Sequence, residues 1–182
     1  MVRDNFAVFI LSHGRANKVA TVKTLKNAGY SGKWYILLDN EDTQIDEYKN
    51  LYGEEHIIIF DKKDAPKYFD FDIMDNFDGN KVITYARNAL NKIALDMKLE
   101  YFWELEDDYF RFDIRMEINN HLPIIHVKNL DEVIEIYLNF LENIFPNIHC
   151  SLYSKLNTTL KKYLYFVSVN NSFPSKLSII SE

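Results

Sequence analysis

Three consecutive acids, Glu106, Asp107 and Asp108, follow directly on the apolar and aromatic run at residues 101–105. Like charges repel one another and disfavour a sheet interior, so we expect this acidic triplet at the exposed carboxyl end of a buried strand. Its hard carboxylate oxygens suit Mg²⁺ or Mn²⁺ bridging to phosphates, and ligands bind at that edge of open α/β sheets. The alternative is an acidic turn after an edge strand.

A second polar group follows the apolar run at residues 6–11, which is typical of a central parallel strand. Ser12, His13 and Arg15 come next, around a glycine that permits a tight turn into a helix. Beside a helix N-terminus these side chains suit an anion or the polar groups of a nucleotide. The chain lacks the P-loop and GxGxxG patterns, and Arg15 could equally be a solvated loop arginine.

The pattern of a strand followed by acids recurs at residues 34–38, which Asp39 ends. A carboxylate at such an edge commonly receives a hydroxyl or base of a nucleotide, so Asp39 is a candidate nucleotide contact. Glu41 and Asp42 are expected to open the next helix, over residues 43–51, where its dipole favours them. A third strand is expected at residues 56–60.

These elements must position the polar groups, and they predict an α/β fold with a mainly parallel sheet flanked by helices. Asn17 is expected to cap a helix at residues 18–28 that Gly29 ends. A helix at 82–98, capped by Asn80, would bring Arg87 to the same edge of the sheet. The remaining predictions are a long connection at 61–80, either a binding loop or a disordered insert, strand-like alternation at 110–125 and a helix at 130–144.

The composition narrows the possible functions. With 47% hydrophobic residues and a net charge of −6, the chain is globular and unsuited to a broad, non-specific grip on nucleic acid. One cysteine permits no internal disulfide, and no run of about 18 apolar residues predicts a membrane span, so a cytoplasmic location is expected. His121, His126 and His149 match no zinc pattern and read as surface or cap histidines.

The composition changes at Cys150. Residues 1–150 hold two serines and a net charge of −9, from 17 Lys+Arg against 26 Asp+Glu; residues 151–182 hold seven serines and a net charge of +3. We therefore expect a nucleotide-binding domain at 1–150 and a divergent or frame-altered tail at 151–182.

Four motifs in order resemble the TET-associated glycosyltransferases, a GT-A-like family found largely in bacteriophages and related viral genomes and thought to glycosylate hydroxymethylated pyrimidines in DNA. The resemblance covers about residues 5–150 and rests on Ile10-Leu11-Ser12-His13-Gly14-Arg15-Ala16-Asn17, Gly32-Lys33-Trp34-Tyr35, Tyr85-Ala86-Arg87-Asn88 and Leu105-Glu106-Asp107-Asp108-Tyr109.

The resemblance implies that the acidic triplet takes the role of the family's DxD motif. Asp108 and Glu106 would hold Mn²⁺ or Mg²⁺ against a nucleotide-diphosphate sugar, expected to be a UDP-sugar. The donor contacts would come from Ser12, His13, Arg15, Asp39, Arg87, Glu106 and Asp107. In GT-A enzymes the acceptor site and any catalytic base come from the second half of the domain, and nothing after Cys150 resembles that half, so the chain is expected to be truncated after its donor-binding half.

Two other classes stay open from the sequence. One is a nucleotide-sugar-binding module or inactive remnant that transfers nothing. The other is a nucleotidyltransferase, which also places metal-binding acids near a nucleotide, although the chain lacks the lysine- and glycine-rich loop of that class.

Overall fold

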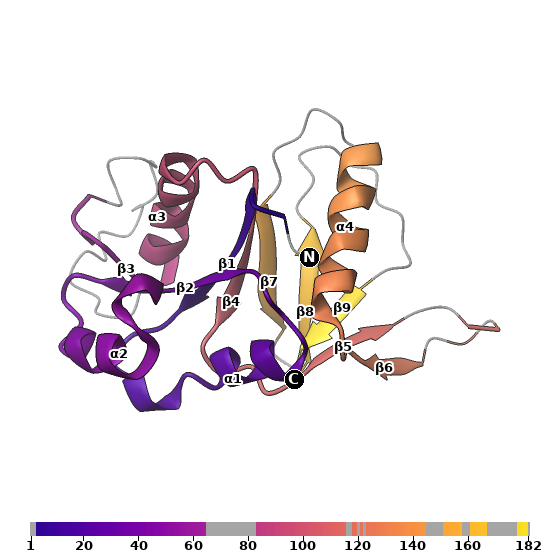
Figure 1. Ribbon diagram of the computed structural model, residues 1–182, viewed down its shortest axis with the longest axis horizontal. Coiled ribbons are helices and arrows are strands. Elements are labelled where there is room, and N and C mark those ends of the chain that lie inside the picture. Colours follow the sequence, from indigo (N-terminus) through magenta and orange to yellow (C-terminus); the bar gives the residue numbers. More distant parts are fainter. Residues whose placement is uncertain are drawn as a thin grey trace.

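A computed structural model describes residues 3–64, 83–115, 118–119, 121, 123–144, 151–157, 161–166 and 178–181. Its strands form one sheet in the order β3-β2-β1-β4-β7-β8-β9-β5-β6 (Figure 1). The first five in this order are parallel and the remaining pairs are antiparallel. The strands are β1 (Phe6–Leu11), β2 (Lys33–Asp39), β3 (Ile57–Phe60), β4 (Tyr101–Glu106), β5 (Phe112–Arg115), β6 (Ile124–His126), β7 (Ser151–Asn157), β8 (Lys161–Phe166) and β9 (Ser178–Ser181).

The order of the parallel strands reverses beside β1. The chain runs outward from β1 through β2 to β3, then crosses back and places β4 on the other side of β1. The carboxyl ends of β1 and β4 therefore flank a topological switch point, the position at which open α/β sheets bind ligands. This arrangement confirms the predicted mainly parallel α/β fold.

Helices cover both faces of the sheet. Side chains of β1 alternate between the two cores: Phe6, Val8 and Ile10 belong to one, and Ala7, Phe9 and Leu11 to the other. Helices α1 (Ala20–Asn27), α2 (Ile45–Tyr52) and α4 (Leu130–Ile144) pack on the first face, and α3 (Ile83–Asp96) packs on the second. β1 is buried on both sides, as a continuous apolar run predicts.

The start of α1 differs from the prediction. A 3-10 turn, η1 (Ala16–Lys18), follows the loop after β1, and Val19 precedes α1 without a side-chain capping bond. The prediction of Asn17 as the N-cap was wrong because this residue lies inside the 3-10 turn, one turn ahead of the helix.

The end of α1 is as predicted, at Gly29. The Tyr30 N–H donates to the Leu25 carbonyl and the Gly29 N–H to the Lys26 carbonyl, while Gly29 takes φ +77°. This pattern is a Schellman motif, which requires a left-handed residue and so favours glycine. A Cβ at Gly29 would lie 2.8 Å from the backbone oxygen of Lys128, so the start of α4 approaches closely here.

Other elements agree with the sequence in type and differ at their ends. The helix predicted at 130–144 is α4, that at 43–51 is α2 and the strands at 34–38 and 56–60 are β2 and β3. The alternation predicted at 110–125 resolves into two antiparallel strands, β5 and β6. Most of the long connection predicted at 61–80 lies outside the described residues, as does the predicted cap Asn80.

The N-terminal segment is tied to α4. The Arg3 guanidinium contacts Glu135, at 3.0 Å, together with Glu142 and Asn139. Hydrogen bonding to Arg3 lowers the pKa of the Glu135 carboxyl. This cluster joins the beginning of the chain to a helix more than 130 residues later.

The backbone of β7 lies beside β4, with Phe102 and Trp103 opposite Ser151 and Leu152. Strands β8 and β9 extend the same sheet toward β5. The division of the chain at residue 150, and its truncation there, stay predictions.

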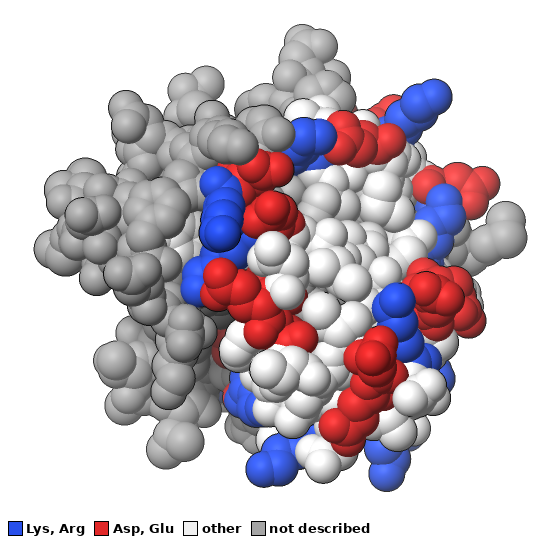
Figure 2. All heavy atoms as spheres, turned by 90° about the vertical axis from the view of Figure 1, so that its left-hand side faces the viewer, with Lys and Arg blue, Asp and Glu red and all other residues white. Residues whose placement is uncertain are grey.

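The surface that Figure 2 shows carries acidic and basic side chains interspersed around an uncharged centre. Among its described residues no broad basic area forms on this face, in keeping with the acidic net charge. No helix in the described part of the chain is both long and apolar enough to cross a membrane.

Candidate functional site

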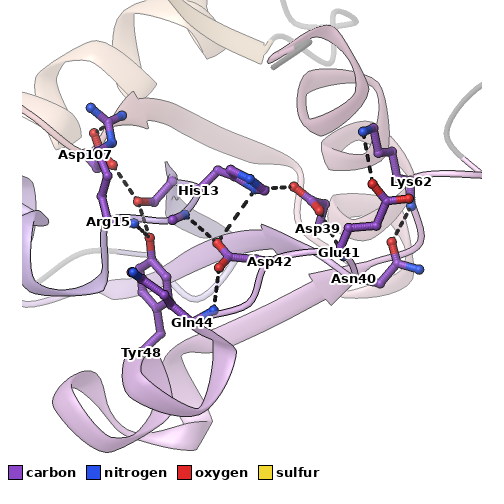
Figure 3. A network of polar contacts seen from close by, with 12 residues as sticks. His13, Arg15, Asp39, Asn40, Glu41, Asp42, Gln44, Tyr48, Lys62 and Asp107 are labelled. Atoms are coloured by element: carbon purple, nitrogen blue, oxygen red, sulfur yellow. Dashed lines mark hydrogen bonds and ion pairs between the residues drawn. The ribbon is translucent and has the colours of Figure 1, made fainter. Parts of the chain in front are cut away.

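The site lies at the β1–β4 switch point, where the loop after β1 meets the acidic triplet after β4. The Ser12 hydroxyl donates a hydrogen bond to Asp107 and lies 2.7 Å from the Tyr48 hydroxyl. The Arg15 guanidinium forms an ion pair with Asp107 at 2.7 Å (Figure 3). Residues that are 95 positions apart in sequence, Ser12 and Asp107, are thus in direct contact.

The side chains of the three acids in the triplet lie in different environments. Asp107 is 1% exposed and faces the loop after β1, whereas Glu106, on the other face of the sheet, approaches Arg87 of α3 at 3.8 Å. Asp108 is exposed to solvent. The prediction that all three acids are exposed was wrong for Asp107, because Ser12 and Arg15 supply the polar contacts that its buried carboxylate needs.

Burial raises the pKa of the Asp107 carboxyl, and the Ser12 hydrogen bond and the Arg15 charge oppose that rise. Arg15 is half exposed, so its guanidinium reaches from this buried carboxylate to solvent at the edge of the site. One side of the Arg15 guanidinium is held by Asp107 and the other is open to solvent, an arrangement suited to an anionic ligand.

Two threonines of α1 fix the turn that carries the triplet. The Thr21 hydroxyl donates to the Glu106 carbonyl at 2.6 Å and accepts from the Tyr109 N–H at 2.9 Å, and the Thr21 N–H donates to the Asp107 carbonyl. The Thr24 hydroxyl donates to the Tyr109 carbonyl at 2.7 Å. The backbone on both sides of Asp108 is therefore ordered before any ligand arrives.

The loop after β1 is held from the other side by the start of α2. The Gly14 N–H donates to Asp42 at 2.8 Å, the Arg15 N–H to the Tyr48 hydroxyl at 3.0 Å and the Ala16 N–H to Gln44 at 2.9 Å (Figure 3). Asp42 also accepts a hydrogen bond from the Gln44 N–H, just before α2. This carboxylate, which was predicted to begin the next helix, therefore links the start of that helix to the loop after β1.

His13 and Asp39 face one another across the same edge. The His13 Nδ1 lies 2.7 Å from an oxygen of Asp39, whose other oxygen accepts from the Glu41 N–H. His13 is about half exposed, so it presents a polar side chain to solvent beside the nucleotide contact predicted at Asp39. Figure 3 shows these groups continuing into a second set of contacts around Lys62.

Arg87 lies at the opposite face of the triplet, near the start of α3. Its Nε donates to Glu104 at 2.6 Å. Glu104 is fully buried, and its second oxygen has no hydrogen-bond partner among the described residues. Burial raises the pKa of the Glu104 carboxyl against the opposing charge of Arg87. Arg87 therefore lies at this edge, as predicted, and its ion pair with the buried Glu104 holds it there.

The structure thus brings Ser12, Arg15 and Asp107 into one cluster, His13 and Asp39 into a second, and Arg87 and Glu106 into a third. Sequence reasoning missed the residues that hold these clusters together, namely Thr21, Thr24, Gln44, Tyr48 and Glu104. The only signal for Glu104 was a charged residue inside an apolar run, and polar positions on the buried faces of α1 and α2 gave no distinct signal.

No group of three or more His, Cys, Asp or Glu side chains in the described part of the chain is arranged to hold a metal ion. Mg²⁺ often takes only one or two protein carboxylates and completes its shell with substrate phosphates and water. Glu106 and Asp108 offer hard oxygen ligands of this kind.

The fold and the edge described above define an α/β protein of the GT-A-like, Rossmann-like class. A sequence model described as TET-Associated Glycosyltransferase matches residues 6–162. The chain therefore belongs to the TET-associated glycosyltransferase family, as its four motifs predicted, and the match extends beyond residue 150. Comparisons with curated proteins and with solved structures found no match.

Proposed function

We propose that this chain binds a nucleotide-diphosphate sugar, in the first instance a UDP-sugar, and transfers its hexosyl group to a hydroxymethylated pyrimidine in DNA. Family membership supports a glycosyltransferase role and a nucleotide-sugar donor. The observation that carries the proposal is the joining of the loop after β1 to the acidic triplet, through Ser12, Arg15 and Asp107, at the switch point.

In this proposal each cluster serves one part of the donor. Arg15 and Asp39 face the nucleoside, with Ser12 and His13 fixing the loop between them. Arg87 faces the diphosphate or the sugar from the side of α3. Asp107 acts through its contacts with Ser12 and Arg15, because a carboxylate that is 1% exposed has little surface left for a ligand.

Glu106 and Asp108 are the proposed ligands of Mn²⁺ or Mg²⁺. Bound there, the cation would neutralise charge on the departing nucleoside diphosphate. The turn that carries both acids is held by four hydrogen bonds to Thr21 and Thr24, which supports a preorganised ligand pair.

Isothermal titration of UDP, UDP-glucose and UDP-N-acetylglucosamine, with and without Mn²⁺, tests the donor site. We expect Mn²⁺-dependent binding that is lost in Asp108→Ala. Asp96→Ala is the matched control, because Asp96 is another exposed aspartate, at the far end of α3. If the wild type binds none of these nucleotides, or if Asp108→Ala binds them as tightly as the wild type does, the proposed donor site is refuted.

Product analysis with hydroxymethylated DNA then decides between functions. Sugar on the pyrimidine supports transfer. Release of pyrophosphate when UTP and a sugar 1-phosphate replace the nucleotide sugar would identify the nucleotidyltransferase alternative. Binding with no product would identify a nucleotide-sugar-binding module or an inactive remnant.

A further inference from the structure

A buried carboxylate lies on an apolar face of the sheet, close to the edge that carries the site. Glu104 of β4 is opposite Phe9 of β1 in the parallel register, and its side chain is 1% exposed. Phe9 and Phe102 belong to the core between the sheet and α3, and Glu104 shares their face. Because burying an ion costs free energy, a glutamate at this position has to be explained by its contacts.

The partner of Glu104 is Arg87 of α3. The Arg87 Nε donates to one oxygen of Glu104 at 2.6 Å, and the Nη2 of the same guanidinium lies 3.8 Å from an oxygen of Glu106. The guanidinium therefore faces two carboxylates of β4, one in the core and one at the end of the strand. The Arg87 side chain is 31% exposed, so this group also reaches solvent at the edge of the site.

The ion pair orders the arginine more clearly than it stabilises the fold. The cost of desolvating two charges offsets much of their attraction, so a buried pair is weak evidence for stability. An unrestrained arginine side chain, however, loses rotamer freedom when it binds a ligand, and Glu104 restricts Arg87 beforehand. Glu104 is too buried to contact a ligand, so an effect on binding has to pass through Arg87.

We propose that Glu104 is a positioning residue of the donor site, and that the group it positions, the Arg87 guanidinium, binds the diphosphate of the donor. This inference rests on the proposed function, in which Arg87 faces either the diphosphate or the sugar. A guanidinium carries a positive charge and a planar fork of donors that matches two phosphate oxygens, whereas sugar hydroxyls are neutral. Arg87 also lies beside Glu106, a proposed ligand of the metal at the diphosphate.

Glu104→Gln and Glu104→Met form a matched pair of variants. Both remove the same charge and keep a side chain of similar length, but only glutamine retains an oxygen that can accept the hydrogen bond of the Arg87 Nε. Each is titrated with UDP in the presence of Mn²⁺, alone and combined with Arg87→Ala. UDP contains the diphosphate and lacks the sugar, and Arg87→Ala leaves no arginine for residue 104 to position.

We expect Glu104→Met to bind UDP about 2- to 12-fold more weakly than Glu104→Gln, which is the range for ordering one long side chain. Combined with Arg87→Ala, the two variants should bind UDP equally, about 10- to 150-fold more weakly than Glu104→Gln alone. Glu100→Met is the control, because it removes an exposed carboxylate just before β4, and it should bind UDP as the wild type does.

Equal UDP affinities for Glu104→Gln and Glu104→Met would overturn the positioning role and leave the donor site standing. A difference that persists in the Arg87→Ala background would also overturn it, because Glu104 would then act by another route. If Arg87→Ala leaves UDP binding unchanged, the assignment of Arg87 to the diphosphate is wrong. A wild type that does not bind UDP overturns this inference, and one that binds no UDP-sugar either refutes the donor site as well.

Arg87→Lys provides the test if Glu104→Met does not fold, because lysine leaves a cation beside Glu104. One compact ammonium lacks the planar fork with which a guanidinium faces a buried carboxylate and a phosphate together. Arg87→Lys should therefore bind UDP about 10-fold or more weakly than the wild type. Equal binding by Arg87→Lys and the wild type would overturn the proposed role of the guanidinium.

Discussion

Two glycines with similar backbone angles give a quantitative test of the fold. Gly14 has φ +63° and Gly29 has φ +77°, so both lie in the left-handed region. An added Cβ at Gly14 meets nothing within 4 Å, whereas one at Gly29 lies 2.8 Å from the Lys128 carbonyl oxygen. The two alanine variants therefore share the conformational cost and differ in the steric one.

The magnitudes follow from these contacts. The left-handed conformation costs a residue with a side chain about 1–2 kcal/mol, offset by about 0.4–1 kcal/mol because alanine restricts the unfolded chain. Gly14→Ala should thus lose about 0–1.6 kcal/mol. Gly29→Ala adds an overpacking cost of about 1–3 kcal/mol, because the clash is with backbone. That backbone is held nearby, where the Leu130 N–H donates to the Ala28 carbonyl at 2.7 Å.

Urea unfolding at equilibrium measures both variants. We expect Gly29→Ala to lose about 1–4.6 kcal/mol of unfolding free energy, with a fall in Tm of about 2–18 °C for a chain of this size. Losses for Gly14→Ala and Gly29→Ala that agree within about 0.5 kcal/mol would refute the close approach of α1 to the segment before α4.

Glu135→Gln should reduce the loss of stability on acidification. Because Arg3 lowers the pKa of Glu135, that carboxylate stabilises the fold above its unfolded value of about 4.3 and ceases to do so as the pH falls through the lowered pKa. Because solvent screens the Arg3–Glu135 pair, the expected difference in unfolding free energy is below about 1 kcal/mol. Urea unfolding between pH 7 and pH 3 measures this difference. Parallel plots of stability against pH for the wild type and the variant would contradict the prediction. Under the proposed function, an acceptor base stacks on Phe110, which is 75% exposed just after the triplet, so Phe110→Ala should raise the acceptor KM by about 5- to 150-fold at unchanged stability. Leu95→Ala, at 74% exposure, is its control, and equal KM values for the two variants would exclude stacking.

The strands and the edge of the sheet could be predicted because apolar runs that end in polar residues are local patterns. Three strand ends, at Leu11, Asp39 and Glu106, fall where the sequence places them. Parallel strands bring such ends together, so the meeting of the loop after β1 with the triplet also follows from the pattern.

The interior contacts could not be predicted, because they depend on register and packing between distant segments. The pairing of Asp113 with His126 is set by the alignment of β5 against β6, and nothing in the spacing of the two residues specifies it. His126 is itself a surface side chain, as predicted, at 55% exposed. Asp107 was expected in solvent because its partners Ser12 and Arg15 are about 95 residues away.

The hold of α1 on the triplet turn has a consequence for the nascent chain. The partners of the loop after β1, namely Asp42, Gln44 and Tyr48, follow it within 36 residues. The contacts between this loop and the start of α2 can therefore form early in synthesis. The hydrogen-bond partners of Thr21 and Thr24 lie in the triplet turn, which is synthesised about 85 residues later. A ribosome-bound chain that stops before β4 would therefore carry the proposed nucleoside contacts without the acidic triplet. We expect it to acquire metal-dependent donor binding only when residue 109 is in place.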